Sequence, residues 1–535
     1  MNQRENLLRR GIPLLCVLGL LFTCLFPQPA AASSVWTIYN EAQKLESKGQ
    51  HEAAIAKYKQ TIPMFVKNKE YGNAGGMHRR IAEIMVKLKR YDEAVEQWDQ
   101  EATYYEKAGR VQDSIAVKNK ANKLRSTVKL YVETQAAIKP ASKLAPLEPA
   151  NGALLGAYAE QDPIVHNPSN GKPFYTDQFP VETGKKHAAY LLYFTYGQPL
   201  SVIQSHINKA KENGTAIELG LQPLNGMGQV KDDAYLRQLA KDAANAGVPI
   251  FIRFANEMNG KWVPWYTTPA VYKQKFQLVA KVFHQEAPDN VAMVWAPNSE
   301  PENTINDYYP GDAYVDWVGV SVYSIFNPTD DPLQLGQDRS SHIEKLDTIY
   351  RLYAARKPIM ISEGAVSYMY PEKRIDKTDW ASYRLRELYS TLPMLYPKVK
   401  AVFWFDANTD GSRIKYYQLT ANQKLLQAYK QSIASPYYLE SIGDSSTLAY
   451  KAVAGSTVAP AKQQLSGYVK TWSPTVASVK YYIAGREAGS AAAPPWTAAI
   501  DFAPYRGKKI DIVVKAFDSS GGLITRKVVT TTVQK

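Results

Sequence analysis

The sequence predicts a multi-domain chain in which an α-helical repeat is followed by a (β/α)8 TIM barrel and then by a β-sandwich. Three observations predict this order. Apolar residues recur with a helical period before residue 135, eight short apolar runs alternate with helix-like stretches over residues 151–435, and alternating strand patterns occupy residues 436–535. A chain of 535 residues is also too long for a single hydrophobic core.

Residues 1–32 have the pattern of a secretory signal peptide. Three arginines precede an apolar run over residues 11–26, and alanines occupy positions 30–32. The run is shorter than the roughly 20 residues that span a bilayer, which favours cleavage after Ala32 over an uncleaved membrane anchor. Both cysteines, Cys16 and Cys24, lie in this segment, so the mature chain would contain no disulfide. We therefore expect a secreted or cell-surface protein of bacterial type.

The formal net charge of +14 permits two interpretations. It can serve solubility, or it can attract an anionic partner. An exported chain is expected to meet an anionic cell-wall polymer rather than nucleic acid. A cell-wall polymer or a protein would then contact the basic helical region.

Residues 33–135 resemble tetratricopeptide-like helix pairs. Alanines at 42 and 54 are answered by alanines at 82 and 94, an offset of forty residues where the usual repeat has 34. Such helices serve either as a groove for a partner or as a spacer. A linker rich in proline and alanine follows over residues 136–150.

Residues 151–435 alternate strands with helices, which predicts a parallel sheet, and eight strands predict a closed barrel. An open doubly wound sheet is the alternative, but no glycine-rich phosphate loop follows the first strand. Residues 436–535 have the alternation of an immunoglobulin-like sandwich, for which we expect a spacer or weak wall-binding role.

Two glutamates follow barrel strands. Glu257 lies in "FIRFANEMNGKWVPWY" after the fourth strand, and Glu363 lies in "PIMISEGAV" at the end of the seventh. Strand ends meet at the barrel mouth, and a pair of facing carboxylates fits the cleavage of a glycosidic bond. The alternative is a structural salt bridge with Arg253. Other carboxylates near strands are ranked as substrate-binding or structural: Glu160, Asp162, Glu218, Glu300, Glu302 and Asp406.

Aromatic residues at or just beyond strand ends are candidate platforms for sugar rings, with core packing as the alternative. They are Trp262, Trp265, Tyr266, Trp295, Tyr323 and Trp404. The loop that contains Trp262 and Trp265 has glycine and proline and is expected to be exposed. The seven histidines have no paired ligand spacing, so no metal and no cofactor is expected.

The motifs "RFANEMNGKWVPWY", "VWAPN", "VGVSVYS" and "ISEGAV" resemble glycoside hydrolase family 26, over residues 151–432. The resemblance implies a retaining glycosidase with Glu257 as acid/base and Glu363 as nucleophile. It also implies roles for four other residues: Asn256 contacts the sugar 2-hydroxyl, Arg253 and Tyr323 support the nucleophile, and Trp404 forms the floor of the subsite.

The chain departs from the family's mannanases at Asn256, where they usually have histidine. Mixed-linkage β-glucan and β-xylan therefore stay open beside β-1,4-mannan as substrates. We expect the enzyme to attack bonds within the polysaccharide chain. Two rival hypotheses also stay open: a degenerate barrel that binds polysaccharide as an envelope scaffold without cutting it, and a helical repeat that recruits a partner.

Overall fold

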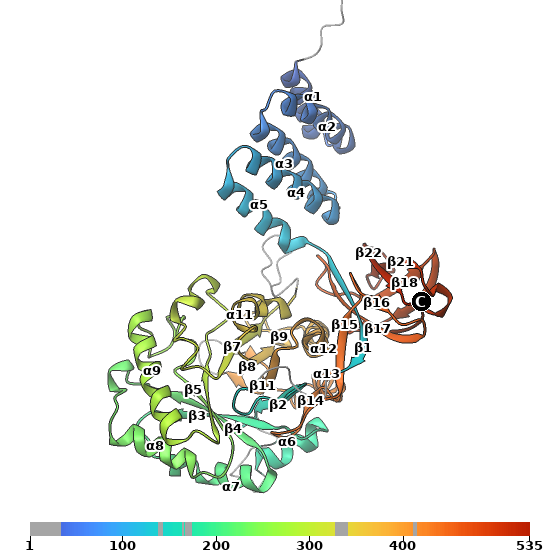
Figure 1. The fold of residues 1–535 in the computed structure, drawn as a ribbon. Coiled ribbons are helices and arrows are strands. Elements are labelled where there is room, and N and C mark those ends of the chain that lie inside the picture. The colour runs from blue at the N-terminus through green and yellow to red at the C-terminus, as the bar shows by residue number, and fades with distance from the viewer. Residues whose placement is uncertain (1–33, 137–142, 163–164, 166–173, 327–340, 410–414) are drawn as a thin grey trace, which may run out of the picture.

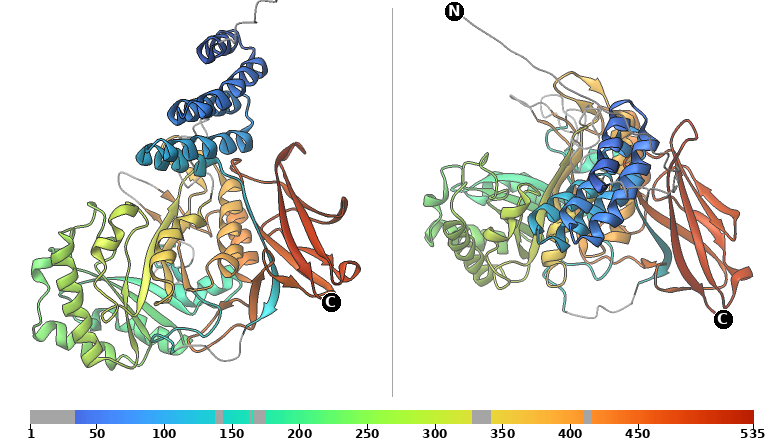
Figure 2. Two further views of the ribbon diagram at one scale, coloured as in Figure 1. Left: turned by 45° about the horizontal axis from the view of Figure 1, so that its top comes forward. Right: turned by 90° about the horizontal axis from the view of Figure 1, so that it is seen from above.

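The structure is a computed structural model, and it describes residues 34–136, 143–162, 165, 174–326, 341–409 and 415–535. The expected signal peptide lies outside these residues. The helical region projects from the barrel, and the sandwich lies beside the barrel (Figures 1 and 2). Along the described part of the chain, no helix combines the length and apolar character that a membrane span requires.

The helical region contains five helices of similar length. They are α1 (Val35–Ser47), α2 (His51–Lys67), α3 (Tyr71–Lys87), α4 (Tyr91–Lys107) and α5 (Val111–Leu124). The four alanines of the predicted repeat are buried in one core, because small side chains let neighbouring helices approach closely. The predicted helical repeat is confirmed.

The turns explain why the repeat is forty residues long. The backbone is left-handed at Gly49, Lys69, Lys89 and Gly109, just beyond the ends of the first four helices. These positions are twenty residues apart, so each helix with its turn takes twenty residues and each helix pair takes forty.

The helical region ends earlier than residue 135, and this corrects the expected extent of the helices. Residues Thr127–Gln135 form strand β1, which pairs with β15 (Leu448–Ala452) on one side and β17 (Lys462–Lys470) on the other. The segment "TVKLYVETQ" is rich in β-branched residues, and Leu130 and Val132 enter the sandwich core. A segment before the barrel thus completes the domain after it.

The barrel is closed, as predicted, and the open-sheet alternative is wrong. Its eight strands are all parallel, and the last pairs with the first. They are β2 (Ala153–Tyr158), β3 (Ala189–Thr195), β4 (Ala216–Gln222), β5 (Ile250–Phe254), β6 (Val291–Trp295), β7 (Trp317–Ser324), β8 (Ile359–Val366) and β11 (Val399–Phe405).

Helices and short strands complete the barrel layer. The helices are α6 (Tyr175–Thr183), α7 (Gln204–Asn213), α8 (Ala234–Ala244), α9 (Pro269–Glu286), α11 (Asp347–Tyr353), α12 (Thr378–Leu395) and α13 (Gln423–Ile433). Two small hairpins lie beyond strand ends: β9 (Met369–Tyr370) with β10 (Ile375–Asp376), and β12 (Asn408–Thr409) with β13 (Lys415–Tyr416). Strand β14 (Tyr438–Leu439) pairs with the start of β2.

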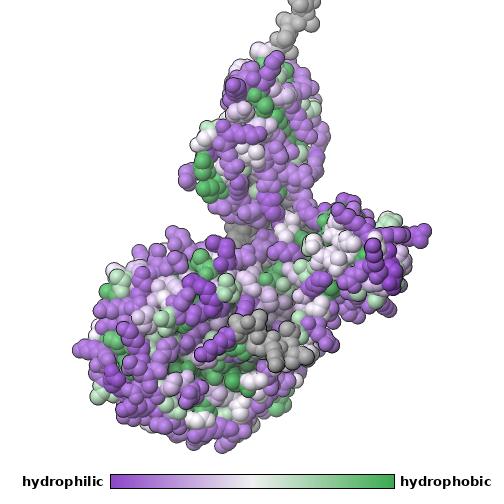
Figure 3. Space-filling model, viewed as in Figure 1, coloured by the Kyte–Doolittle hydropathy of each residue, from purple (hydrophilic) through white to green (hydrophobic). Residues whose placement is uncertain are grey.

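The sandwich consists of two sheets around one core. The first has the order β15, β1, β17 and β20 (Ala498–Asp501). The second has the order β16 (Thr457–Val458), β22 (Leu523–Val533), β21 (Lys509–Phe517), β18 (Ser478–Ile483) and β19 (Arg486–Ala491). On the face seen in Figure 3, hydrophilic residues predominate over the helical region, whereas the sandwich shows hydrophilic residues beside intermediate and hydrophobic ones.

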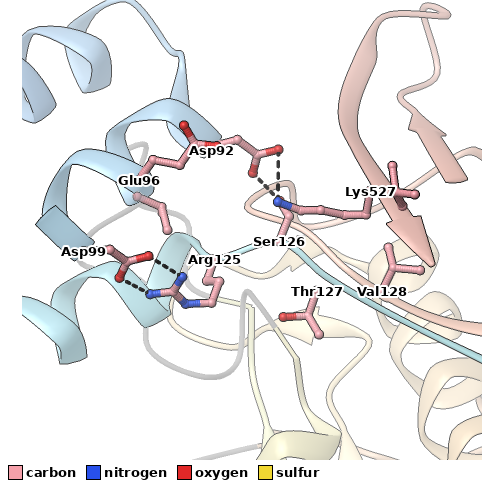
Figure 4. A pocket seen from close by; sticks show the side chains of 10 residues that line it. Asp92, Glu96, Asp99, Arg125, Ser126, Thr127, Val128 and Lys527 are labelled. Atoms are coloured by element: carbon pink, nitrogen blue, oxygen red, sulfur yellow. Dashed lines mark hydrogen bonds and ion pairs between the residues drawn. The ribbon is translucent and has the colours of Figure 1, made fainter. Parts of the chain in front are cut away.

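Polar contacts hold the helical region against the sandwich. Asp92 of α4 accepts hydrogen bonds from Ser126 at 2.7 Å and Thr525 at 2.5 Å, and it faces Lys527 at 3.9 Å (Figure 4). Asp99, about two turns further along α4, accepts hydrogen bonds from both terminal nitrogens of Arg125. These contacts and β1 fix the orientation of the helices relative to the sandwich.

The sandwich also makes buried contacts with the barrel. Arg384 of α12 pairs with Glu387 at 2.7 Å and donates to the Pro474 carbonyl of the sandwich at 2.9 Å. Tyr468 of β17 donates to Glu344 at 2.8 Å. Such contacts need matched partners from both regions, because an unpaired buried charge is costly.

We predict that Leu130→Ala destabilises the C-terminal sandwich although Leu130 precedes the barrel. Removing its buried side chain leaves a cavity in the sandwich core and should cost about 2–5 kcal/mol. Hydrogen exchange of β17 and β21 measures this loss. The exposed neighbour Lys129→Ala should change protection by less than about 0.5 kcal/mol. Unchanged exchange in Leu130→Ala would contradict the shared core.

Candidate active site

The chain leaves strand β5 through a strained turn that carries Glu257. Strand β5 ends at Phe254, and Ala255 and Glu257 have φ of 48° and 56°, a region that residues with a side chain rarely occupy. The Glu257 amide donates to the Ala296 carbonyl at 2.8 Å, which holds the turn to the end of β6. This turn, rather than the alternation of side chains along a strand, therefore places the Glu257 carboxyl. Backbone strain of this kind clusters at functional sites.

Glu257 accepts hydrogen bonds from two side chains, one later in the same loop and one after β6. Its Oε2 accepts from the Trp262 indole at 2.7 Å, and its Oε1 accepts from the Asn298 amide at 2.9 Å. Burial raises the pKa of Glu257, and the negative charge of Glu363 raises it further, against the opposing effect of these hydrogen bonds. Glu257 therefore keeps its proton to higher pH than an ordinary glutamate.

Glu363 has a different environment, in which three side chains donate hydrogen bonds to its carboxylate. Its Oε1 accepts from the Tyr193 hydroxyl at 2.6 Å and from Arg253 Nη1, and its Oε2 accepts from the Tyr323 hydroxyl at 2.7 Å. The pairing register of β7 and β8 shifts next to Glu363. Such an irregularity re-aims a side chain. The donors stabilise negative charge on this carboxylate.

The two glutamates line one cavity of about 290 Å3. Its other lining residues are Tyr193, Gln222, Asn256, Val263 and Trp265. Trp262 and Tyr266 are 58% and 41% exposed and follow Glu257 in the same loop. The predicted residues Asn256, Glu257, Trp265 and Glu363 are thus brought together, and Arg253 and Tyr323 support Glu363 from behind.

Two predicted sugar platforms are wrong. Trp295 is completely buried among Tyr309 and Tyr353 of the outer layer. Trp404 is completely buried against Tyr429 of α13. Both indoles point out of the strands toward the helices, so neither meets a ligand at the mouth.

The neighbour of Trp404 takes the inner position instead. The ring of Phe405 stacks on that of Tyr158, with 4.8 Å between the ring centroids, and lies edge-on to that of Tyr323, with 5.8 Å between the centroids. Trp265, expected in an exposed loop, is buried, and its indole donates to the Asn256 carbonyl at 2.7 Å. It still reaches the cavity wall.

Four further residues contact the pair or its supports, and sequence reasoning missed three of them. Tyr193 binds Glu363, Asn298 binds Glu257, Ser321 lies beside Glu257, and Glu218 lies beside Arg253. Asn298 stands in the quoted motif "VWAPN", where a polar residue after a strand is a usable signal. Tyr193 stands in an apolar run without such a signal, and Glu218 was ranked as substrate-binding or structural.

Asp162 and Asp406 form a second carboxyl pair, which joins the segments after β2 and β11. Both side chains are completely buried. Thr420 donates to Asp162 at 2.5 Å, and the Leu419 amide donates to Asp406 at 2.6 Å. Burial raises the pKa of Asp406 well above its usual range, and the hydrogen bond and charge of Asp162 add to this. Asp406 therefore keeps its proton to higher pH than an ordinary aspartate does.

Among the described residues, no group of three or more histidine, cysteine, aspartate or glutamate side chains is arranged to hold a metal ion.

Two family models match parts of this chain. The one described as "Glycosyl hydrolase family 26" matches residues 227–337, which contain β5, β6, β7 and Glu257. The resemblance to glycoside hydrolase family 26 is confirmed. The model described as "Soluble NSF attachment protein, SNAP" matches residues 29–143, over the helical region.

Curated relatives match the chain in part. "Endoglucanase H" of Acetivibrio thermocellus is 25% identical over 262 residues, 45% of this chain and 27% of the relative. "Mannan endo-1,4-beta-mannosidase" of Bacillus subtilis is 34% identical over 95 residues, 16% of this chain and 25% of the relative. The chain spans about a quarter of the length of these relatives.

Solved structures include a modular endo-β-1,4-mannanase from Cellulomonas fimi of family 26. It has a TM-score of 0.42 and 17% identity, and the match covers 73% of this chain and all of that one.

We predict that Asp406→Asn flattens the decline of stability with rising pH. Because the folded state raises the pKa of Asp406, Asp406 binds its proton more tightly in the folded state than in the unfolded chain. Stability therefore falls as pH rises above about 3.9, the unfolded pKa. Urea unfolding at pH 5 and pH 8 should show a smaller difference in Asp406→Asn than in the wild type, whereas the exposed control Asp289→Asn should match the wild type. Equal differences in all three proteins would contradict a raised pKa of Asp406 in the folded state.

Proposed function

We propose that the chain is a secreted retaining β-glycanase, which cleaves β-1,4-mannan-type or related β-glucan polysaccharide from within the chain. The observation that carries this proposal is the pair of glutamates that lines one cavity in two different environments. Glu257 keeps a proton to higher pH, and Glu363 is surrounded by donors that favour its charged form. The family match over residues 227–337 supports the same conclusion.

The two environments divide the chemistry between the glutamates. Glu363 attacks the anomeric carbon and forms a glycosyl ester, while protonated Glu257 gives its proton to the leaving oxygen. Glu257, now ionised, takes a proton from water, and that water breaks the ester and releases the sugar with its configuration retained.

The cavity wall supports a polymer of sugar rings as substrate. Trp262 and Tyr266 present exposed aromatic surface beside Glu257, on which a sugar ring can stack. Asn256 lines the cavity beside the acid/base and would contact the 2-hydroxyl. The names of the relatives, an endoglucanase and a mannan endo-1,4-β-mannosidase, support both polymers as candidates.

A substrate panel tests the proposal. We expect purified protein to release reducing ends from at least one of mannan, glucomannan, lichenan and xylan. Proton NMR of the first product should show retained anomeric configuration. Binding to one of these polymers with no release of reducing ends would instead support a non-catalytic scaffold, and an inverted product would contradict Glu363 as the nucleophile.

Substitution of each glutamate should have a different effect. We predict that Glu363→Ala loses activity on every substrate, because no group replaces the nucleophile. Glu257→Ala should lose about 10²–10⁴-fold on polysaccharide but less on a dinitrophenyl glycoside, whose leaving group needs no acid. Azide should partly restore turnover of Glu257→Ala by attacking the glycosyl ester. Glu212→Gln, an exposed carboxylate of α7 in the outer layer of the barrel, is the matched control and should keep wild-type activity.

Activity on polysaccharide should follow a bell-shaped pH profile. The alkaline limb falls as Glu257 loses its proton, so it should lie above the pH expected for an ordinary glutamate, because the pKa of Glu257 is raised. With a dinitrophenyl glycoside, the alkaline limb of kcat/KM should disappear. A polysaccharide profile that is flat at alkaline pH would contradict an acid role for Glu257.

A further inference from the structure

We propose that Glu218, a residue with no role in the function proposed above, positions Arg253 against Glu363. This inference rests on the proposed function, because it assigns how the nucleophile is supported. Glu218 does not line the cavity and would act through the guanidinium of Arg253. It is a positioning residue, not a catalytic one.

The guanidinium of Arg253 bridges two carboxyls from opposite sides of the barrel interior. Its Nε lies 3.3 Å from Glu218 Oε1, and its Nη1 donates to Glu363 Oε1. Arg253 and Glu218 are both completely buried, so water cannot substitute for either partner. A planar guanidinium held at two corners has one orientation, whereas one held at a single corner can pivot.

Strand β4 supplies both the space and a second carboxyl group for this arrangement. Gly220 of β4 pairs in register with Arg253 of β5. A Cβ at Gly220 would lie 3.3 Å from Arg253 Nη2, closer than most side-chain contacts. Glu218 stands two residues earlier, on the same face of the strand. The strand is therefore shaped around the guanidinium.

Glu218 gains importance once the proposed glycosyl ester forms. The ester removes the negative charge of Glu363, and Arg253 then retains a buried positive charge. Leaving a buried charge without a partner is strongly unfavourable. Loss of the Glu363 charge removes one of the effects that raise the pKa of Glu218, so the ionised form of Glu218 is favoured beside Arg253 and holds the guanidinium in place.

Several titratable groups face the guanidinium. They are Glu218 on β4, Glu363 on β8 and Tyr193 on β3. Tyr323 on β7 and Glu257 after β5 interact with Glu363. Burial raises the pKa of Glu218 to about 8, with the charge of Arg253 opposing this rise and that of Glu363 adding to it. Near neutral pH, Glu218 is therefore predominantly neutral. The carboxylate of Glu363 then balances the positive charge of Arg253. Glutamine reproduces this neutral form and its accepting oxygen.

The test compares Glu218→Leu, Glu218→Asp and Glu218→Gln. Leucine removes the anchor, aspartate withdraws it by one methylene, and glutamine retains an acceptor at the same reach. Thr215→Val, a buried site just before the same strand, is the control for general destabilisation. Two measurements are made on the full chain: the pH profile of kcat/KM on a dinitrophenyl glycoside, and crystal structures that locate the Arg253 guanidinium.

We expect Glu218→Leu and Glu218→Asp to lower kcat/KM by about tenfold or more. Their acid limb, which reports ionisation of the nucleophile, should move up by about half a pH unit or more, because Arg253 no longer favours the charged form of Glu363. Glu218→Gln should stay within about threefold of the wild type, and Thr215→Val should not move the limb. Crystals should show the contact between Arg253 and Glu363 kept in Glu218→Gln and lost in Glu218→Asp.

Two results would overturn the proposal. One is a folded Glu218→Asp or Glu218→Leu protein with a lower melting temperature but a wild-type acid limb, which indicates a purely structural ion pair. The other is an unchanged contact between Arg253 and Glu363 in those crystals. If the wild type cleaves no glycoside at all, the proposed function fails, but the crystal structures still decide whether Glu218 orients Arg253.

Discussion

The buried ion pair between Arg253 and Glu363 is the constraint on which the candidate site depends. A guanidinium without access to water must find its partners within the barrel, and Glu363 and Glu218 come from strands on either side of it. The same carboxylate is bonded by tyrosines of β3 and β7. Five strands, β3, β4, β5, β7 and β8, therefore have to meet in a closed barrel before Glu363 is held in place.

Glu257 depends on a different device, because the chain leaves β5 before it reaches this residue. A left-handed turn, the indole of Trp262 and the amide of Asn298 place the carboxyl. The two glutamates thus have unlike surroundings. Glu363 is embedded among strand residues that carry a positive charge or donate a hydrogen bond, and Glu257 is held in a loop by neutral donors. That difference allows two identical side chains to differ in protonation.

Sequence reasoning located the barrel and the two glutamates because both leave strong local signals. Glu257 follows a strand in a segment dense in polar and aromatic residues, and Glu363 interrupts an apolar run. The sequence could not assign which face of a strand each tryptophan takes. Trp404 and Phe405 are adjacent and equally apolar, and only the closure of β11 against β2 decides that Phe405 turns inward.

Long-range pairing explains the other differences. Strand β1 has nine residues and is polar at one end. Its partners lie more than three hundred residues later, so its sequence does not reveal where it belongs. Glu218 stands within an apolar strand, where its chemistry is visible only once Arg253 is placed beside it. Both cases depend on contacts between strands, which a pattern within one segment does not encode.

The helical region and the sandwich are connected more closely than a chain of separate modules would require. Strand β1 continues from α5 into the sandwich, and the sandwich in turn contacts α12 of the barrel through Arg384. Movement of the helices is thereby coupled to the domain that packs on the barrel.

The central claim is that Glu363 forms a covalent bond with the sugar, and trapping tests it most directly. The protein is incubated with 2-deoxy-2-fluoro glycosides of mannose, glucose and xylose that carry a dinitrophenyl leaving group, and the labelled peptide is sequenced by mass spectrometry. The account predicts one label, on Glu363, and none in Glu363→Ala. A label on another residue, or turnover of a natural substrate without any trapped ester, would contradict it.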